Sequence, residues 1–321
     1  MKPGAALTGA LLATLASPAT WLLGLATFLL RGGLVLVALP IVVLPSPVGL
    51  GNLLAPILMT VVFGGLSVEV AAVATLSALS IVTWLFVGGV VAATLEAEAA
   101  RLVAGDEAAS GAPADVAWDD RARSERIVAA RVLVVRVLAH APTGAAVIWA
   151  ALRLVQVAYR ELTSPDDVTQ PIVLRVLAGA PEAAVLLLIA WTAGEVVGGL
   201  AARRIVLDGS GVAGALRDAV RATVRHPVGI LVSFAVPLAG LVLVLVPSTL
   251  AATVAWSAVR VAMRSPAELV VGTLTVLLFV SLWIVGLLLI AVTAAWRAAV
   301  WSVAHRGLWP RPAHLTTLWP G

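Results

Sequence analysis

The chain of 321 residues is 61% hydrophobic and 12% charged, with a mean hydropathy of +1.06. Soluble domains are closer to half apolar and a quarter charged, so this composition excludes an ordinary water-soluble globule. The net charge of +4 does not indicate nucleic acid, because the arginines lie beside apolar runs with few aromatic residues between them. The sequence has no cysteine, which excludes disulfides, thiolate nucleophiles and Cys-based metal sites.

Six apolar runs are long enough to cross a bilayer, at about 1.5 Å per residue and a hydrocarbon core of about 30 Å. They predict an all-α, polytopic membrane bundle. In chain order the runs cover residues 19–44, 70–95, 137–157, 182–202, 228–246 and 269–296. The N-terminal residues 1–17 precede them and read either as a short amphipathic helix or as a signal peptide.

The segments between the runs suggest three similar two-span units, each with a basic lead-in, a proline, a span outward, an interfacial outer segment and a span back. The expected outer segments include residues 52–65 and 249–264, and Pro247 is expected to close the fifth span. A hydrophilic loop is predicted between the first two units. The boundaries are 1–104, 105–125 for the loop, 126–208, 209–305, and 306–321 for a tail.

Residues 212–225 predict a surface helix with a basic face. Arg217, Arg221 and Arg225 recur every fourth residue beside an apolar row at the same spacing. Such a helix can bind lipid headgroups or dock a protein partner. The alternative is an ordinary cytoplasmic connector that obeys the positive-inside rule.

The distribution of basic residues predicts an orientation. Of the 21 Lys and Arg residues, fifteen fall on the side of the N-terminus, and Arg31 and Arg153 lie within spans. The opposite side holds four, which are Arg160, Arg175, Arg260 and Arg264. By the positive-inside rule both termini are expected in the cytoplasm.

Charges inside the apolar runs are the candidate functional residues. Arg31 and Glu195 would each cost about 2.5–3.5 kcal/mol at mid-bilayer, so each should face protein or water. The Gly194-x-x-x-Gly198 spacing would let helices approach closely, and we expect Arg31 and Glu195 to form a buried ion pair between spans one and four. The alternative is that Glu195 is wetted near the inner surface while Arg31 snorkels. Arg153 is expected to snorkel toward the outer headgroups.

Signatures of enzymes are few. The four histidines form no HExxH or triad-like cluster, and Gly209-Ser210-Gly211 lacks a nucleotide-binding pattern. No cofactor, metal site or nucleic-acid partner is predicted. The expected partners are membrane lipids and a protein on the cytoplasmic face.

The segment Arg203–Pro227, RRIVLDGSGVAGALRDAVRATVRHP, supports a resemblance. Its span end, glycine-rich break, Gly-Ala-Leu and His-Pro resemble an element of uncharacterised polytopic inner-membrane proteins of high-GC actinobacteria. It is also distantly similar to the membrane domain attached to glycerophosphodiester phosphodiesterases. The resemblance implies a six-span bacterial inner-membrane protein and names no substrate. The catalytic barrel of those enzymes has no counterpart here.

Two functions follow as hypotheses. The first is a membrane scaffold or transport-associated subunit that handles a lipidic or small ligand or docks a partner. The second is an intramembrane enzyme or permease acting on a lipid, with Glu195 as the proton-handling residue. A cavity reaching Glu195 would favour the second or a permease, whereas a sealed pair would favour the first.

Overall fold

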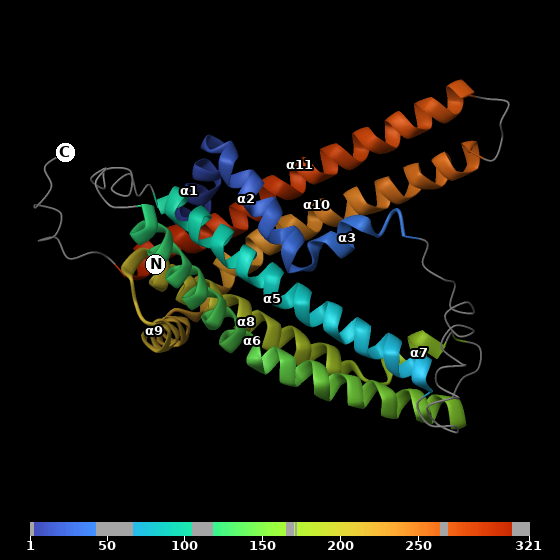
Figure 1. The fold of residues 1–321 in the computed structure, drawn as a ribbon, viewed down its shortest axis with the longest axis horizontal. Helices are drawn as coiled ribbons and strands as arrows, with labels where there is room; N and C mark the ends of the chain where they lie inside the picture. The colour runs from blue at the N-terminus through green and yellow to red at the C-terminus, as the bar shows by residue number, and fades with distance from the viewer. Residues whose placement is uncertain are drawn as a thin grey trace, which may run out of the picture.

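The computed structural model describes residues 3–42, 67–104, 118–164, 170, 172–263 and 269–309, and the regular elements in these ranges are all helices (Figure 1). They are α1 (Pro3–Ala16), α2 (Pro18–Phe28), the wide turn η1 (Leu29–Gly33), α3 (Leu34–Ala38), α5 (Val68–Ala104), α6 (Trp118–Thr163), α7 (Ile172–Ala178), α8 (Pro181–Asp208), α9 (Val212–Arg225), α10 (Pro227–Ala262) and α11 (Leu269–Leu308). Proline begins α2, α8 and α10, at positions where the missing N–H would have no helical partner. Gly209 ends α8 with φ of 68°, a left-handed conformation that glycine adopts without strain.

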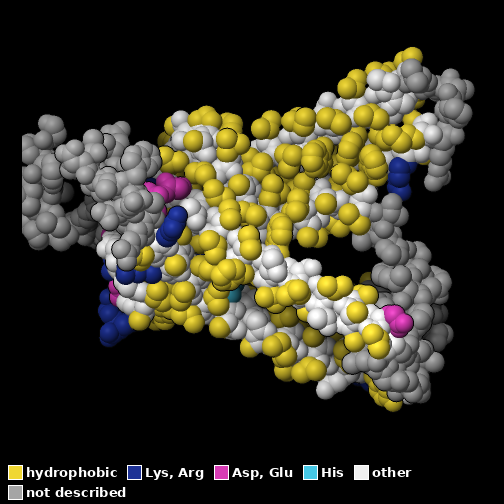
Figure 2. All heavy atoms as spheres, viewed as in Figure 1, with side chains coloured by type: hydrophobic (Ala, Val, Ile, Leu, Met, Phe, Trp, Pro, Cys, Tyr) yellow, Lys and Arg dark blue, Asp and Glu magenta, His cyan; other side chains and the backbone are white. Residues whose placement is uncertain are grey.

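Six helical segments of the described chain are long and apolar enough to cross a membrane, with α2 to α3 counted as one. Large hydrophobic side chains cover their outer surfaces, and every position from 72 to 87 of α5 is exposed. Figure 2 shows hydrophobic side chains over the middle of the bundle and charged ones gathered toward its ends. Water would not tolerate this surface, so the medium around the helices is lipid. The chain is a multi-pass integral membrane protein, and the predicted all-α bundle is confirmed.

The helices form two close pairs joined at one end. α6 lies along α8, and α10 lies along α11. The pairs diverge toward the end that carries α7, whereas α1, α9 and the last turns of α11 gather at the other end, which we call the α9 end (Figure 1). The largest hydrophobic cluster is at the α9 end, where Leu200, Ala215 and Ile230 are almost fully buried.

Several boundaries differ from the prediction. The first span is interrupted at η1 instead of running unbroken to residue 44. The fifth span does not end at Pro247, and the expected separate outer helix over residues 249–264 is, up to Ala262, a continuation of α10. A helix is the form that satisfies its own backbone in lipid, and contact with α11 holds α10 together across the proline.

Some predictions concern residues that lie outside the described ranges. The outer segment 52–65, residues 105–117 of the hydrophilic loop and residues 310–321 of the tail lie outside the described residues. From Trp118 the chain is helical, so α6 begins within the predicted loop and continues for 46 residues.

Candidate functional site

The first transmembrane segment breaks at Arg31. Arg31 has φ of −88° and ψ of 21°, and Gly32 has φ of 101°, so the backbone leaves helical geometry between α2 and α3. Glycine permits the positive φ at little cost. Interrupted helices at membrane depth are characteristic of ligand and ion sites, because the freed backbone must be buried in protein or line a cavity.

Glu96 of α5 lies among three arginines from three other segments. Ala93, Ala97 and Ala100 share its buried helix face and let neighbouring helices approach, so the Glu96 side chain is only 4% exposed. Arg136 of α6 donates from Nε to Glu96 Oε2 at 3.1 Å, and its Nη2 donates to Oε1. Arg31 and Arg203 also donate to this carboxylate. One anion therefore joins η1, α5, α6 and α8.

Glu195 of α8 forms a second centre next to the first. Arg297 of α11 donates from Nη2 to Glu195 Oε2 at 2.6 Å, and His140 Nε2 lies 3.3 Å from Oε1. Arg136 Nη1 lies 3.9 Å from the same Oε1. Arg136 therefore stands between both carboxylates and links the two centres into one network.

Arg203 is the most deeply buried of these arginines, at 1% side-chain exposure. Besides Glu96, it donates from Nη2 to the Ala298 carbonyl at 2.8 Å and from Nε to Ser302 Oγ at 3.4 Å. All three of its nitrogens are engaged by protein. Arg203 therefore acts as a structural cation that ties α8 to α5 and α11.

Close helix packing at glycines places these side chains. A Cβ added at Gly194 would lie 2.9 Å from His140 Cδ2, and one at Gly198 would lie 3.2 Å from Arg136 Cδ. A Cβ at Gly199 would lie 3.2 Å from the Trp301 ring. The predicted glycine spacing thus brings α8 against α6 rather than against the first span.

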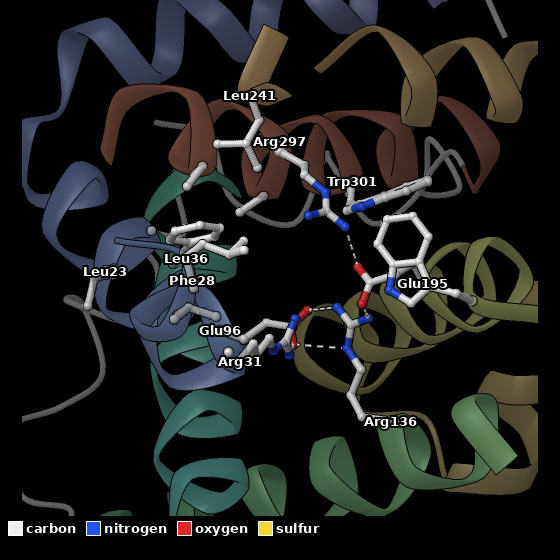
Figure 3. Close-up of a pocket in the computed structure, with 18 of the residues that line it drawn as sticks. Leu23, Phe28, Arg31, Leu36, Glu96, Arg136, Glu195, Leu241, Arg297 and Trp301 are labelled. Atoms are coloured by element: carbon white, nitrogen blue, oxygen red, sulfur yellow. Dashed lines mark hydrogen bonds and ion pairs between the residues drawn. The ribbon is translucent and has the colours of Figure 1, made fainter. Parts of the chain in front are cut away.

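The network lines a cavity of about 430 Å³. Figure 3 shows a row of charged side chains from Arg297 through Glu195, Arg136 and Glu96 to Arg31, with Leu23, Phe28, Leu36 and Leu241 on the other side. The lining also includes Val35 and Leu36, which are 67% and 39% exposed, so it extends to the lipid-facing surface of α3. A volume of 300–1,000 Å³ with apolar walls and a few fixed polar groups is typical of ligand sites.

The cavity has an excess of positive charge. The lining holds Arg31, Arg136, Arg203 and Arg297 against Glu96 and Glu195, which is four cations and two anions. Within the described part of the chain, Arg31 and Arg297 each hydrogen-bond to protein through Nη2 alone. Arg136 Nη1 is buried and has no hydrogen-bond partner among the described residues. The Arg297 guanidinium is held 5.8 Å from the ring centres of both Trp191 and Phe234. Arg31 and Arg297 can bind an anion without giving up their carboxylates.

No protein-family profile, curated protein or solved structure matches this chain. The site is therefore interpreted from its own geometry. Among the described residues no group of three His, Asp or Glu side chains is arranged to hold a metal ion.

The predicted Arg31–Glu195 pair is wrong in its partners. Both residues line the cavity, but Arg31 pairs with Glu96 and Glu195 pairs with Arg297. Close approach at the glycines puts α6 beside α8, and Arg136 of α6 then lies between the two expected partners. Arg153 is far along α6 from the cavity, where it donates from Nε to Glu182 Oε1 at 2.6 Å, and both side chains are partly exposed.

Arg217, Arg221 and Arg225 lie on the exposed side of α9 and are not part of the cavity. The face of α9 that packs on the bundle consists of Ala215, Ala219 and Ala222.

Sequence reasoning missed Glu96, Arg136, Arg203 and Arg297. Each lies at the end of an apolar run, where charged residues are ordinary in a membrane protein. One signal was available for Glu96, since an acidic residue at that end is unusual and alanines at helical spacing flank it.

Proposed function

We propose that this protein is a transport-associated subunit of a bacterial cytoplasmic membrane, and that its cavity binds a lipidic or small anionic ligand. A sealed ion pair would have favoured a scaffold, but Glu195 lines the cavity, so the scaffold hypothesis is set aside. The observation that carries the proposal is the cavity itself, which four arginines and two glutamates line within an apolar bundle. Ionisable groups inside membranes are costly, and those that persist commonly mark ligand or ion sites. A network with balanced charge would serve packing alone, whereas this one has two cations in excess.

The proposed orientation of the chain determines where in the membrane the ligand would bind. With both termini in the cytoplasm, the α9 end lies on the cytoplasmic side and the cavity in the inner half of the membrane. The exposed arginines of α9 then face the headgroups of the inner leaflet or a protein partner. The resemblance of Arg203–Pro227 to bacterial inner-membrane proteins is compatible with this placement.

Native mass spectrometry of the full chain, purified in mild detergent with its own lipids, tests the proposal. We expect a retained anionic lipid or metabolite in the wild-type protein and its loss in Arg297→Gln. Recovery of the protein with no bound anion under any gentle extraction would count against it. Arg153→Gln is the matched control, because Arg153 is a helix arginine paired with one glutamate outside the cavity.

A proton-coupled permease is the second candidate, and one contact favours it. The cavity reaches Glu195, whose Oε1 lies 3.3 Å from His140 Nε2, so a carboxylate and an imidazole are placed to exchange a proton. Reconstituted protein with a pH-sensitive dye inside the vesicles would detect ligand-dependent proton movement. Equal signals from wild type and Glu195→Gln would remove this role.

A further inference from the structure

The excess charge of the cavity points to a particular class of anion. Four arginines and two glutamates line the cavity, which leaves two positive charges uncompensated. We infer that the ligand is a membrane lipid whose headgroup is a phosphate monoester. The inference rests on the proposed function and narrows it to one headgroup chemistry.

The free donors of the cavity suit a phosphate. Arg31 and Arg297 come from different segments, η1 and α11, and in the described part of the chain each bonds to a glutamate through Nη2, which leaves its Nε and Nη1 N–H groups for a ligand. Nε–H and Nη1–H lie on different edges of a guanidinium, so each arginine can donate separate charge-assisted hydrogen bonds to phosphate oxygens. Arg136 and Arg203 also donate to Glu96, and their charges add to the positive potential of the cavity. Arg203 uses all three of its nitrogens on protein, whereas Arg136 Nη1 is buried without a hydrogen-bond partner among the described residues and adds a third donor beside those of Arg31 and Arg297.

Charge separates the monoester from other anionic lipids. A phosphate monoester carries about 1.5 to 2 negative charges near pH 7 and has three terminal oxygens for hydrogen bonds. It would neutralise the cavity nearly completely. A phosphodiester or a fatty-acid carboxylate carries one charge, so it would leave one cation uncompensated in a medium where uncompensated charge is costly.

The shape of the lining supports a lipid as the carrier of the phosphate. Leu23, Phe28 and Leu36 lie across the open space from the charged row (Figure 3). The exposed Val35 carries this apolar side of the lining out to the lipid-facing surface. A headgroup can thus lie between the arginines while its hydrocarbon chain leaves along α3 into the membrane. A soluble phosphate would have no use for this apolar exit.

The test compares the binding of four anions to the protein reconstituted in phosphatidylcholine nanodiscs. Phosphatidic acid supplies the monoester, phosphatidylglycerol the diester, oleate the carboxylate, and glycerol 3-phosphate the same monoester without a lipid chain. We expect phosphatidic acid to bind at least about tenfold more tightly than phosphatidylglycerol or oleate, the order of one additional charge-assisted contact. We expect glycerol 3-phosphate to bind more weakly than phosphatidic acid.

Variants assign the preference to the cavity. Arg31→Gln and Arg297→Gln should each abolish the preference for phosphatidic acid, whereas Arg153→Gln should keep it. The selectivity of the wild-type protein stands as a test even if a cavity variant does not fold. Equal binding of phosphatidic acid and phosphatidylglycerol would overturn the monoester inference and leave the proposed function in place. Equal binding of glycerol 3-phosphate would overturn the lipid part alone, and no binding of any anion would overturn both.

Discussion

Glu96→Gln is the substitution that should damage this protein most for the smallest change in volume. The amide keeps the shape of the side chain but removes the one charge that Arg31, Arg136 and Arg203 share. Arg31 is 32% exposed and can turn toward lipid headgroups or water, but Arg203 is 1% exposed and cannot. Removing one partner of a buried ion pair costs about 3–5 kcal/mol, and that is the loss of stability we expect.

Glu98 provides the matched control on the same helix. It is 44% exposed and pairs at 2.6 Å with Arg101 one turn later, a surface contact worth about 0–1 kcal/mol. At about 2–4 °C per kcal/mol, Glu96→Gln should lower the midpoint of thermal unfolding by about 6–20 °C and Glu98→Gln by less than about 4 °C. Intrinsic tryptophan fluorescence in one detergent, with size-exclusion profiles before and after heating, measures both.

A double variant examines the cause of the loss. Arg203→Met in the Glu96→Gln background removes the buried cation that Glu96→Gln leaves uncompensated, so it should recover part of the lost stability. Equal melting of Glu96→Gln and Glu98→Gln would refute the reasoning, because it would mean that the arginines do not depend on Glu96.

Three further outcomes follow from the packing and the topology. Gly194→Ala should cost about 1–3 kcal/mol because its Cβ would lie 2.9 Å from His140 Cδ2, whereas Gly214→Ala, with no atom within 4 Å of its Cβ, should stabilise α9 slightly in the same thermal assay. Gly32→Ala should lower the stability by about 1–2 kcal/mol in the same assay, because φ is 101° at this position although no atom lies within 4 Å of the added Cβ. An unchanged melting midpoint would contradict the backbone break at Gly32. The chain has no cysteine, so Arg217→Cys and Thr163→Cys report orientation directly: in intact cells a membrane-impermeant maleimide should label the second and spare the first, and the reverse pattern would invert the topology.

The sequence predicts the helical class well because lipid imposes strong rules on composition. About twenty apolar residues between basic connectors have few other stable forms, so all six spans are found. Their ends are less well predicted, since α6 begins at Trp118 and not at residue 137, and α10 ends at Ala262 and not at residue 246. The continuation of α10 past Pro247 could not be predicted, because proline ends helices in water while contact with α11 sustains this one.

The site is predictable only in part, for a reason of geometry. Arg31 and Glu195 stand out because each is a charge inside an apolar run, and both line the cavity. Their partners Glu96 and Arg297 lie where a run ends, and a charge there is ordinary in any membrane protein. Which carboxylate pairs with which arginine depends on the packing of α6 against α8. A single sequence does not show which helices are neighbours, so the pairing could not be predicted.

The most direct test of the account is an experimental structure of the full chain in a nanodisc that contains phosphatidic acid. The account predicts the ion network around Glu96 and Glu195 and a compact density for a phosphate within hydrogen-bond distance, about 2.7–3.2 Å, of Arg31 and Arg297. It also predicts chain density that leaves along α3. A cavity closed by side chains, or one with Arg31 and Arg297 turned away from each other toward water, would contradict it.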